Sequence, residues 1–136
     1  MPIVFKNSKH IDAGQLNELY DDVQWYAYTK DMQLLQQAVQ QSLDVVTAWD
    51  GEVLVGLIRV VGDGLTIIYV QDILVRTAYH NQGIATQLMK QMMDRYPDVR
   101  QKVLLTEEAP DVRHFYEKNG FQSCDQGSLV AFARFN

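Results

Sequence analysis

Hydrophobic positions along the first third of the chain follow two different periods, which predict a short strand and then helices. The apolar run Pro2 to Phe5 predicts a first strand. Residues Asp12 to Asp22 predict a helix, because Asp12 offers an N-cap, Gln15 stands where a capping box needs it, and leucines follow at helical spacing. The aromatic segment Val23–Tyr28 predicts a loop, and a second helix fits Asp31–Ser42.

A stretch rich in valine and isoleucine follows, and its turns predict three strands. These strands are Asp44–Trp49, Glu52–Val61 and Leu65–Val75. Asp50-Gly51 predicts a type I′ hairpin turn, which needs positive φ at both central residues, and Gly62-Asp63-Gly64 predicts a second turn. Strands joined by tight turns form an antiparallel meander.

The remaining chain alternates between helical and strand patterns. The elements predicted here are a helix from about Gly83 to Pro97, a strand Lys102–Leu105, a helix from Pro110 to a C-cap at Asn119-Gly120, and two final strands, from Phe121 onward and Leu129–Phe135. The alternation from Leu65 onward predicts an α/β domain with some parallel pairing. No linker or repeat interrupts the pattern, so residues 1–136 are predicted to form a single domain.

Composition narrows the function classes. The 136 residues are 47% hydrophobic, which is an ordinary globular balance. The net charge of −5 argues against non-specific nucleic-acid binding, which needs a basic surface. Cys124 is the only cysteine, so neither a disulfide framework nor a multi-cysteine metal site is expected. The sequence shows no signal-peptide pattern and no membrane-spanning run, which predicts a cytoplasmic protein with no membrane partner.

The segment from Val70 to Thr86 is the most informative for chemistry. A strand leads through a short loop to Gly83, where a helix begins. Helix N-termini carry unpaired N–H groups and a positive dipole end, and glycine permits close approach of a ligand, so this is a candidate phosphate site. A single glycine before a helix is also compatible with a simple turn. The chain has neither a P-loop nor a GxGxxG run.

Two motifs of this chain resemble those of the GNAT superfamily of acyl-CoA-dependent N-acyltransferases. Its motif A, Gln/Arg-x-x-Gly-x-Gly/Ala, is matched by His80-Asn81-Gln82-Gly83-Ile84-Ala85, with Ile73-Leu74-Val75 upstream as the leading strand. Phe115-Tyr116-Glu117-Lys118-Asn119-Gly120-Phe121 is similar to the end of the motif B helix. The order of elements also fits over nearly the whole chain. One departure is His80, which stands where glutamine or arginine is usual.

The resemblance implies an α/β fold: a GNAT-like mixed, mostly antiparallel central sheet of about six to seven strands flanked by about four helices. It implies acetyl-CoA as the acetyl donor and no metal. The pyrophosphate would lie on the loop and helix start, with pantetheine along the preceding strand. The cofactor residues implied are Ile73, Leu74, Val75, His80, Asn81, Gln82, Gly83, Ile84, Ala85, Thr86 and Tyr116. The side chain of His80 either contacts phosphate or is simply exposed.

Amine attack on a thioester needs a neutral amine, a stabilised oxyanion and a proton for the departing thiolate. By resemblance, Tyr116 is the expected general acid and the Leu74 N–H the expected oxyanion donor. Asp72 is the only carboxylate in Leu65–Val75, so it is either the base or a structural anchor. A regular strand would place Asp72 on the same face as Val70, and a β-bulge could redirect it. Thr106 could contact the pantetheine arm or cap the helix that follows it, and capping is favoured.

The acceptor is expected to be a small-molecule amine. Aromatic side chains can hold an ammonium or a flat ring, and the candidates are Trp25, Tyr26 and Tyr28, with Tyr69 lining the same cleft. The pair Glu107-Glu108 could attract a cation, although loop charges are usually only solvated. Peptide acceptors and a homodimer remain open.

Two alternatives stand beside the enzyme reading. The chain could be a non-catalytic acyl-CoA-binding sensor or interaction module of the same fold, or a purely structural domain in which Gly83 is only a turn residue.

Overall fold

A computed structural model of the chain describes residues 2–136. The chain divides into two compact units, one ending at Leu105 and one beginning at Thr106. That residues 1–136 form a single domain stays a prediction.

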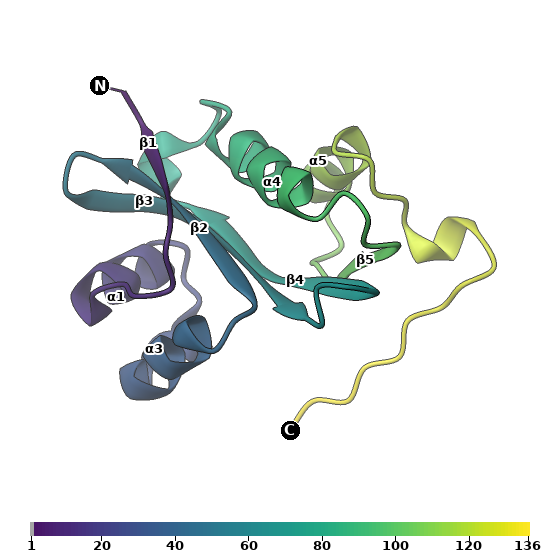
Figure 1. Cartoon of the computed structure of the whole chain (residues 1–136), viewed down its shortest axis with the longest axis horizontal. Helices are drawn as coiled ribbons and strands as arrows, with labels where there is room; N and C mark the ends of the chain where they lie inside the picture. Colours follow the sequence, from purple (N-terminus) through teal and green to yellow (C-terminus); the bar gives the residue numbers. More distant parts are fainter. Residues whose placement is uncertain (1) are drawn as a thin grey trace. The chain divides into compact units, whose positions relative to one another are not determined.

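The first unit is built on a five-stranded sheet in the order β1-β2-β3-β4-β5 (Figure 1). The strands β1 to β4 pair antiparallel, and β5 pairs parallel to β4. Their bounds are β1 Val4–Asn7, β2 Asp44–Asp50, β3 Val53–Gly62, β4 Ile67–Val75 and β5 Gln101–Leu104. The predicted mixed, mostly antiparallel sheet is confirmed.

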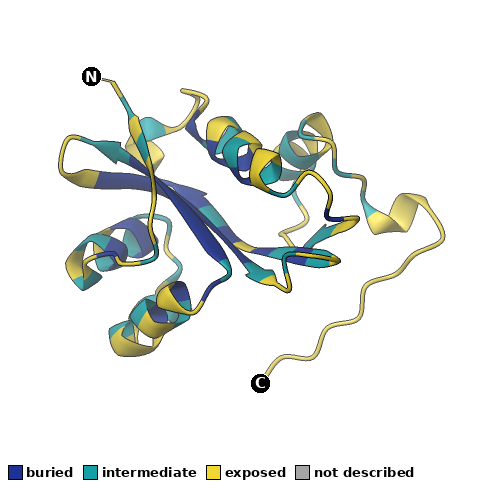
Figure 2. Cartoon of the chain, in the orientation of Figure 1, coloured by how far each residue is buried: buried dark blue, intermediate teal, exposed yellow. Residues whose placement is uncertain are grey.

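Helices cover both faces of this sheet. The helices of the first unit are α1 Ala13–Asp22, α2 Tyr26–Thr29, α3 Met32–Gln40 and α4 Ile84–Arg95. Helices α1 and α3 lie on one face, and α4 lies on the other, against β2, β3 and β4 (Figure 1). Gly56 of β3 permits the close approach of α4, because a Cβ there would lie 3.2 Å from Leu88 and 3.3 Å from Ile84. The central strands β2 and β3 are largely buried between these layers, whereas the outer strands β1 and β5 are half-buried or exposed (Figure 2).

Local sequence signals placed most of these elements correctly. The carboxylate of Asp12 accepts from the N–H of Gln15 at 3.1 Å, which confirms the predicted N-cap of α1. The side chain of Gln15 accepts instead from the N–H of Leu54 on β3, so the capping box is only half formed. Tertiary contact has taken over the side chain that the local pattern assigned to the cap.

Two local predictions are wrong. The β2–β3 turn has Gly51 and Glu52 at its centre, and only Gly51 has positive φ (+59°), the pattern of a type II′ turn rather than type I′. The aromatic segment predicted as a loop contains the four-residue helix α2. A pattern that short is below what helical periodicity can reveal.

The second unit has one helix, α5 Pro110–Lys118, and a 3₁₀ turn, η2 Cys124–Gln126. Arg113 of α5 forms an ion pair with Asp125 of η2, which joins the two, and a second with Glu108, which precedes α5. Proline at the helix start is confirmed, but Ala109 is the N-cap, so Thr106 does not cap α5. Glu108 is exposed and held by Arg113, in agreement with a solvated loop charge.

The two final strands predicted from the sequence are absent, so the sheet has five strands rather than six to seven. Residues 127–136 are extended and exposed (Figure 2), with Phe132 at 93% and Phe135 at 83% exposure. An apolar strand-like sequence forms a strand only when another strand edge supplies its hydrogen bonds. In the second unit, residues 106–136, there is no strand to pair with.

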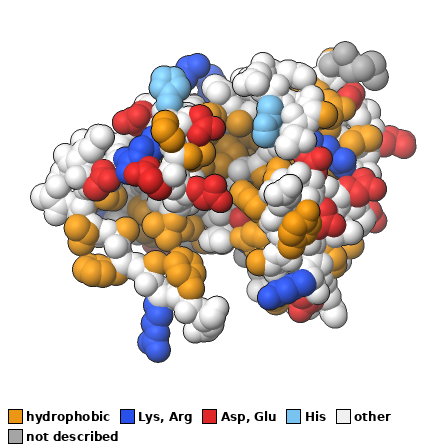
Figure 3. Space-filling view, turned by 180° about the vertical axis from the view of Figure 1, so that it is seen from behind, with side chains coloured by type: hydrophobic (Ala, Val, Ile, Leu, Met, Phe, Trp, Pro, Cys, Tyr) orange, Lys and Arg blue, Asp and Glu red, His pale blue; other side chains and the backbone are white. Residues whose placement is uncertain are grey.

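Within residues 2–136, none of the helices has the length and apolarity needed to cross a membrane. On the face shown in Figure 3, lysine and arginine side chains are scattered among acidic and apolar ones rather than gathered into a basic patch. This agrees with the acidic composition.

Candidate functional site

The central feature of the first unit is the point where β4 and β5 separate. β5 pairs with Ile67 to Val70 only, whereas β4 continues to Val75. Within residues 2–105, the stretch Gln71–Val75 therefore has β3 on one side and no strand on the other. Such an edge presents main-chain groups that can pair with an extended ligand.

A β-bulge lies at the same point. Arg59 of β3 is opposite Asp72 and Val60 is opposite Val70, so Gln71 has no partner on β3. The extra residue puts Asp72 on the α1/α3 face and Val70 on the α4 face, although a regular strand would put them on one face. The redirecting bulge considered in the sequence analysis is present.

The register also shows which main-chain groups face the free edge. The N–H of Arg76 donates to Val55 O at 2.8 Å, which fixes this pair as a hydrogen-bonded one. Since hydrogen-bonded pairs alternate along an antiparallel ladder, the N–H of Leu74 also faces β3, and those of Ile73 and Val75 face the free edge. This geometry argues against Leu74 as the oxyanion donor and favours Ile73.

A loop leads from the free edge to the start of α4. It contains the 3₁₀ turn η1, Thr77–Tyr79, which is anchored where Tyr79 donates to Asp50 at 2.6 Å. Asn81 (φ +63°) and Gly83 (φ +79°) then take left-handed conformations. No side chain caps α4, and a Cβ on Gly83 would meet nothing within 4 Å. The first N–H groups of the helix are thus left for a ligand.

His80 has a structural contact of its own. Its Nε2 lies 2.8 Å from the carbonyl oxygen of Val75. A carbonyl can only accept, so Nε2 carries the proton in this contact. The ring therefore ties the loop to the end of β4 and uses a carbonyl that faces the free edge.

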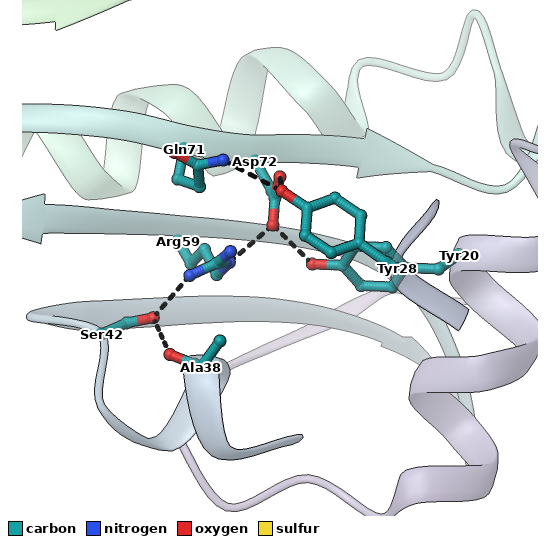
Figure 4. Close-up of polar contacts among 7 residues, drawn as sticks. All are labelled: Tyr20, Tyr28, Ala38, Ser42, Arg59, Gln71 and Asp72. Atoms are coloured by element: carbon teal, nitrogen blue, oxygen red, sulfur yellow. Dashed lines mark hydrogen bonds and ion pairs between the residues drawn. The ribbon is translucent and has the colours of Figure 1, made fainter. Parts of the chain in front are cut away.

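Asp72 is the centre of a buried polar network beside the bulge (Figure 4). Its Oδ2 accepts from Arg59 Nε at 2.5 Å and from the Tyr20 hydroxyl at 2.9 Å, and its Oδ1 accepts from the Tyr28 hydroxyl at 2.7 Å. Asp72 is only 3% exposed. Both oxygens of the carboxylate are engaged, so the anchor role of Asp72 is better supported than the base role.

The tyrosines and the arginine of this network have raised pKa values. Burial, followed by the charge of Asp72, raises the pKa of Tyr20 well above its ordinary value and raises the pKa of Tyr28. Burial alone would lower the pKa of Arg59, but the negative charge of Asp72 and the hydrogen bond that Arg59 donates to it raise this pKa. The two phenols therefore stay protonated and the guanidinium stays charged at neutral pH.

The predicted acceptor residues differ in their surroundings. The rings of Trp25 and Tyr28 lie 6.3 Å apart, and both pack on Tyr20, at 6.0 and 5.2 Å between ring centroids. Tyr26 is 58% exposed, and Tyr69 is half-buried on β4 opposite Val61. Only Tyr28 has a hydroxyl fixed by the Asp72 network.

Tyr116 lies on α5 in the second unit, half-buried between the rings of Phe115 (5.1 Å) and Phe121 (6.0 Å). Burial raises the pKa of Tyr116, although a hydrogen bond with Thr106 acts in the opposite direction. A phenol in this state is protonated at neutral pH and can donate. Thr106 thus contacts Tyr116 rather than the helix end.

Sequence reasoning missed Tyr20, Arg59 and Gln71. One signal was available: Arg59 is a lone charge in the apolar strand Val53–Gly62, and a buried charge needs a partner. The bulge at Gln71 had no comparable signal. Among residues 2–136, no group of three or more histidine, cysteine or carboxylate side chains is placed to hold a metal ion.

Comparison with known proteins gives consistent results. A family model described as an acetyltransferase (GNAT) domain matches residues 13–135. A GNAT-family acetyltransferase from Streptococcus pneumoniae TIGR4 is 32% identical, with a TM-score of 0.88 over 99% of this chain and 98% of that chain. No protein with a curated description matches the chain.

Two further solved structures share the fold at low identity. A protein of unknown function from meticillin-resistant Staphylococcus aureus is 20% identical, with a TM-score of 0.81 over 98% of this chain and all 100% of that one. AAC(6')-Iy, solved with the bisubstrate analogue CoA-S-monomethyl-acetylneamine, is 13% identical, with a TM-score of 0.74 over 100% of this chain and 99% of that one. Since the family match extends over residues 13–135 and includes both motifs, the chain belongs to the GNAT acetyltransferase family.

Proposed function

We propose that the protein is an N-acetyltransferase that moves an acetyl group from acetyl-CoA to the primary amine of a small molecule. One observation carries the proposal: the free edge of β4 from Gln71 to Val75 leads, through a single short loop, to the uncapped start of α4 at Gly83. A strand edge next to an open helix N-terminus offers complementary sites for an extended amide-bearing arm and a pyrophosphate.

The residues present fit acetyl-CoA. The pyrophosphate would be held by main-chain N–H groups from Gln82 to Thr86, where the helix dipole favours negative charge. The pantetheine arm would pair with the free edge through Ile73 and Val75. The main-chain conformation around Asn81 and Gly83 keeps side chains out of this region, and His80 acts by holding the loop rather than by contacting phosphate.

Acetyl-CoA supplies the acetyl thioester, whose C–S bond breaks as the C–N bond to the acceptor forms. The N–H of Ile73 replaces that of Leu74 as the oxyanion donor, because it faces the free edge. By the family resemblance, Tyr116 is the proposed donor of a proton to the departing sulfur, and it would regain one from water. The amine binds in its neutral form and loses one proton to water, with Asp72 as anchor rather than base.

A small-molecule acceptor is supported by the aromatic segment beside the bulge, with Tyr26 exposed and Tyr28 anchored. AAC(6')-Iy, of the same fold, has been solved with an analogue that joins CoA to an acetylneamine. The engaged carboxylate of Asp72 favours one alternative, a non-catalytic acyl-CoA-binding module. Thiol release with amines separates the two, because a binding module would take up acetyl-CoA without turnover.

Calorimetric titration with acetyl-CoA tests the proposal, using wild type, Gly83→Glu and Gly51→Glu. Both glycines have positive φ, and a Cβ at either meets nothing within 4 Å, so both variants add a carboxylate at a strained but sterically open position. Gly83→Glu should weaken binding at least about 100-fold, because the added carboxylate repels the pyrophosphate. Gly51→Glu, in the β2–β3 turn, should bind like wild type. Failure of folded wild type to bind acetyl-CoA would refute the proposal.

A further inference from the structure

Gln71, the bulged residue of β4, lies at the first position beyond the β4–β5 pairing and is exposed. Its Nε2 donates to the Tyr28 hydroxyl oxygen at 3.0 Å (Figure 4). This contact joins an exposed amide to the buried Asp72 network. Glutamine cannot take a proton, so the contact requires an explanation other than base catalysis.

The network determines which end of the amide is free. Tyr28 gives its only proton to Asp72 Oδ1, because Asp72 is ion-paired with Arg59 and acts only as an acceptor. Tyr28 can therefore only accept from Gln71, which requires Nε2 to face the phenol and leaves Oε1 free. Within residues 2–105, Gln71 Oε1 has no hydrogen-bond partner.

Two neutral hydrogen-bond acceptors consequently lie next to each other at the bulge. One is Gln71 Oε1, and the other is the remaining lone pair of Tyr28 Oη. The charge of Asp72 is balanced by Arg59, so the pair offers no uncompensated negative charge that would favour an ammonium. A neutral primary amine has two N–H groups to donate and one lone pair for attack, which matches two acceptors beside the free edge of β4.

We propose that Gln71 and Tyr28 position the acceptor amine by accepting its two N–H groups, and that this pair makes the enzyme selective for primary over secondary amines. Asp72 is a positioning residue in this arrangement, because it fixes the Tyr28 hydroxyl. The inference rests on the proposed function and adds the class of acceptor and the residues that select it. A secondary amine has a single N–H and would leave one acceptor unpaired, which costs binding.

Steady-state kinetics with tyramine and N-methyltyramine, followed by thiol release, test this inference. The variants are Gln71→Met, which keeps length without hydrogen bonds, and Tyr28→Phe, which keeps the packed ring. Gln40→Met, at the exposed end of α3, is the matched control. Each site variant should raise KM for tyramine about tenfold and reduce the preference for tyramine over N-methyltyramine, with KM for acetyl-CoA unchanged. The control should equal wild type.

Several results would overturn the inference while leaving the cofactor site intact. These are equal tyramine KM values in Gln71→Met and Gln40→Met, no preference of wild type for tyramine, or acetyl-CoA binding without tyramine turnover at tens of millimolar. The acceptor pair of Gln71 and Tyr28 should bind a simple primary amine such as tyramine at that concentration. Absence of acetyl-CoA binding in calorimetry, or binding without thiol release with any amine, would instead reject the proposed function itself.

Discussion

Two buried carboxylates on opposite faces of the sheet are held by similar kinds of hydrogen-bond donors. Asp72 accepts from an arginine Nε at 2.5 Å and from two tyrosine hydroxyls. Asp44, on β2 against α4, accepts from Arg95 Nε at 2.6 Å, the Tyr96 hydroxyl at 2.8 Å and the Asn7 amide at 2.7 Å. A carboxylate held by arginine and tyrosine is therefore not in itself a sign of a catalytic site.

The two clusters differ in what lies beside them. Asp44 belongs to β2, which has β1 and β3 as neighbours, whereas Asp72 follows a bulge on a strand with a free edge. The arginines differ too: the Arg59 side chain is 6% exposed and that of Arg95 is 46% exposed. The free main chain next to Asp72 is therefore what indicates function. The ion pair between Arg59 and Asp72 holds this part of β4 in place.

The largest expected effect is on stability, in Asp72→Ala. This change leaves Arg59 and two phenols buried without their acceptor and should lower the free energy of unfolding by about 3–5 kcal/mol. Asp44→Ala should cost less, because Arg95 can turn to water. Urea unfolding followed by circular dichroism measures both, and equal losses would contradict the proposed difference between the clusters.

The next effect is on turnover, in Tyr116→Phe. If Tyr116 protonates the departing sulfur, kcat should fall about 100-fold with little change in acetyl-CoA affinity. Tyr96→Phe makes the same change in the Asp44 cluster and should leave kcat unaltered. A fall of kcat in both variants would indicate a shared effect on folding rather than proton donation.

The smallest effect concerns pH and Asp44. Burial would raise the pKa of Asp44, but hydrogen bonds from Arg95, Asn7 and Tyr96 outweigh it and lower the pKa below the ordinary 3.8. A lowered folded-state pKa stabilises the fold above 3.8, and that stability is lost as pH falls through the folded-state value. At neutral pH the free energy of unfolding of wild type should exceed that of Asp44→Asn by about 1–2 kcal/mol. Urea titrations at several pH values should show this gap narrowing in acid, and a constant gap would contradict it.

The sequence predicted more about the cofactor side than about the acceptor side. Gly83, the loop from His80 and the helix end at Asn119-Gly120 are local features, and main-chain sites of this kind require small residues at fixed spacing. The acceptor side depends on Tyr20, Tyr28, Arg59 and Gln71, which come from four different elements. No local pattern relates an arginine on β3 to an aspartate on β4.

Apart from the four-residue helix α2, the sequence by itself determined the order of helices and strands up to α5, as well as the family and the start of α4, because caps, glycines and hydrophobic periods act over a few residues. Tertiary structure decided the rest. The register of β3 and β4 created the bulge at Gln71, turned Asp72 toward the α1/α3 face and directed the N–H of Ile73, not Leu74, to the free edge. It also left Leu129–Phe135 without strand structure, because pairing needs a partner edge that no local sequence provides.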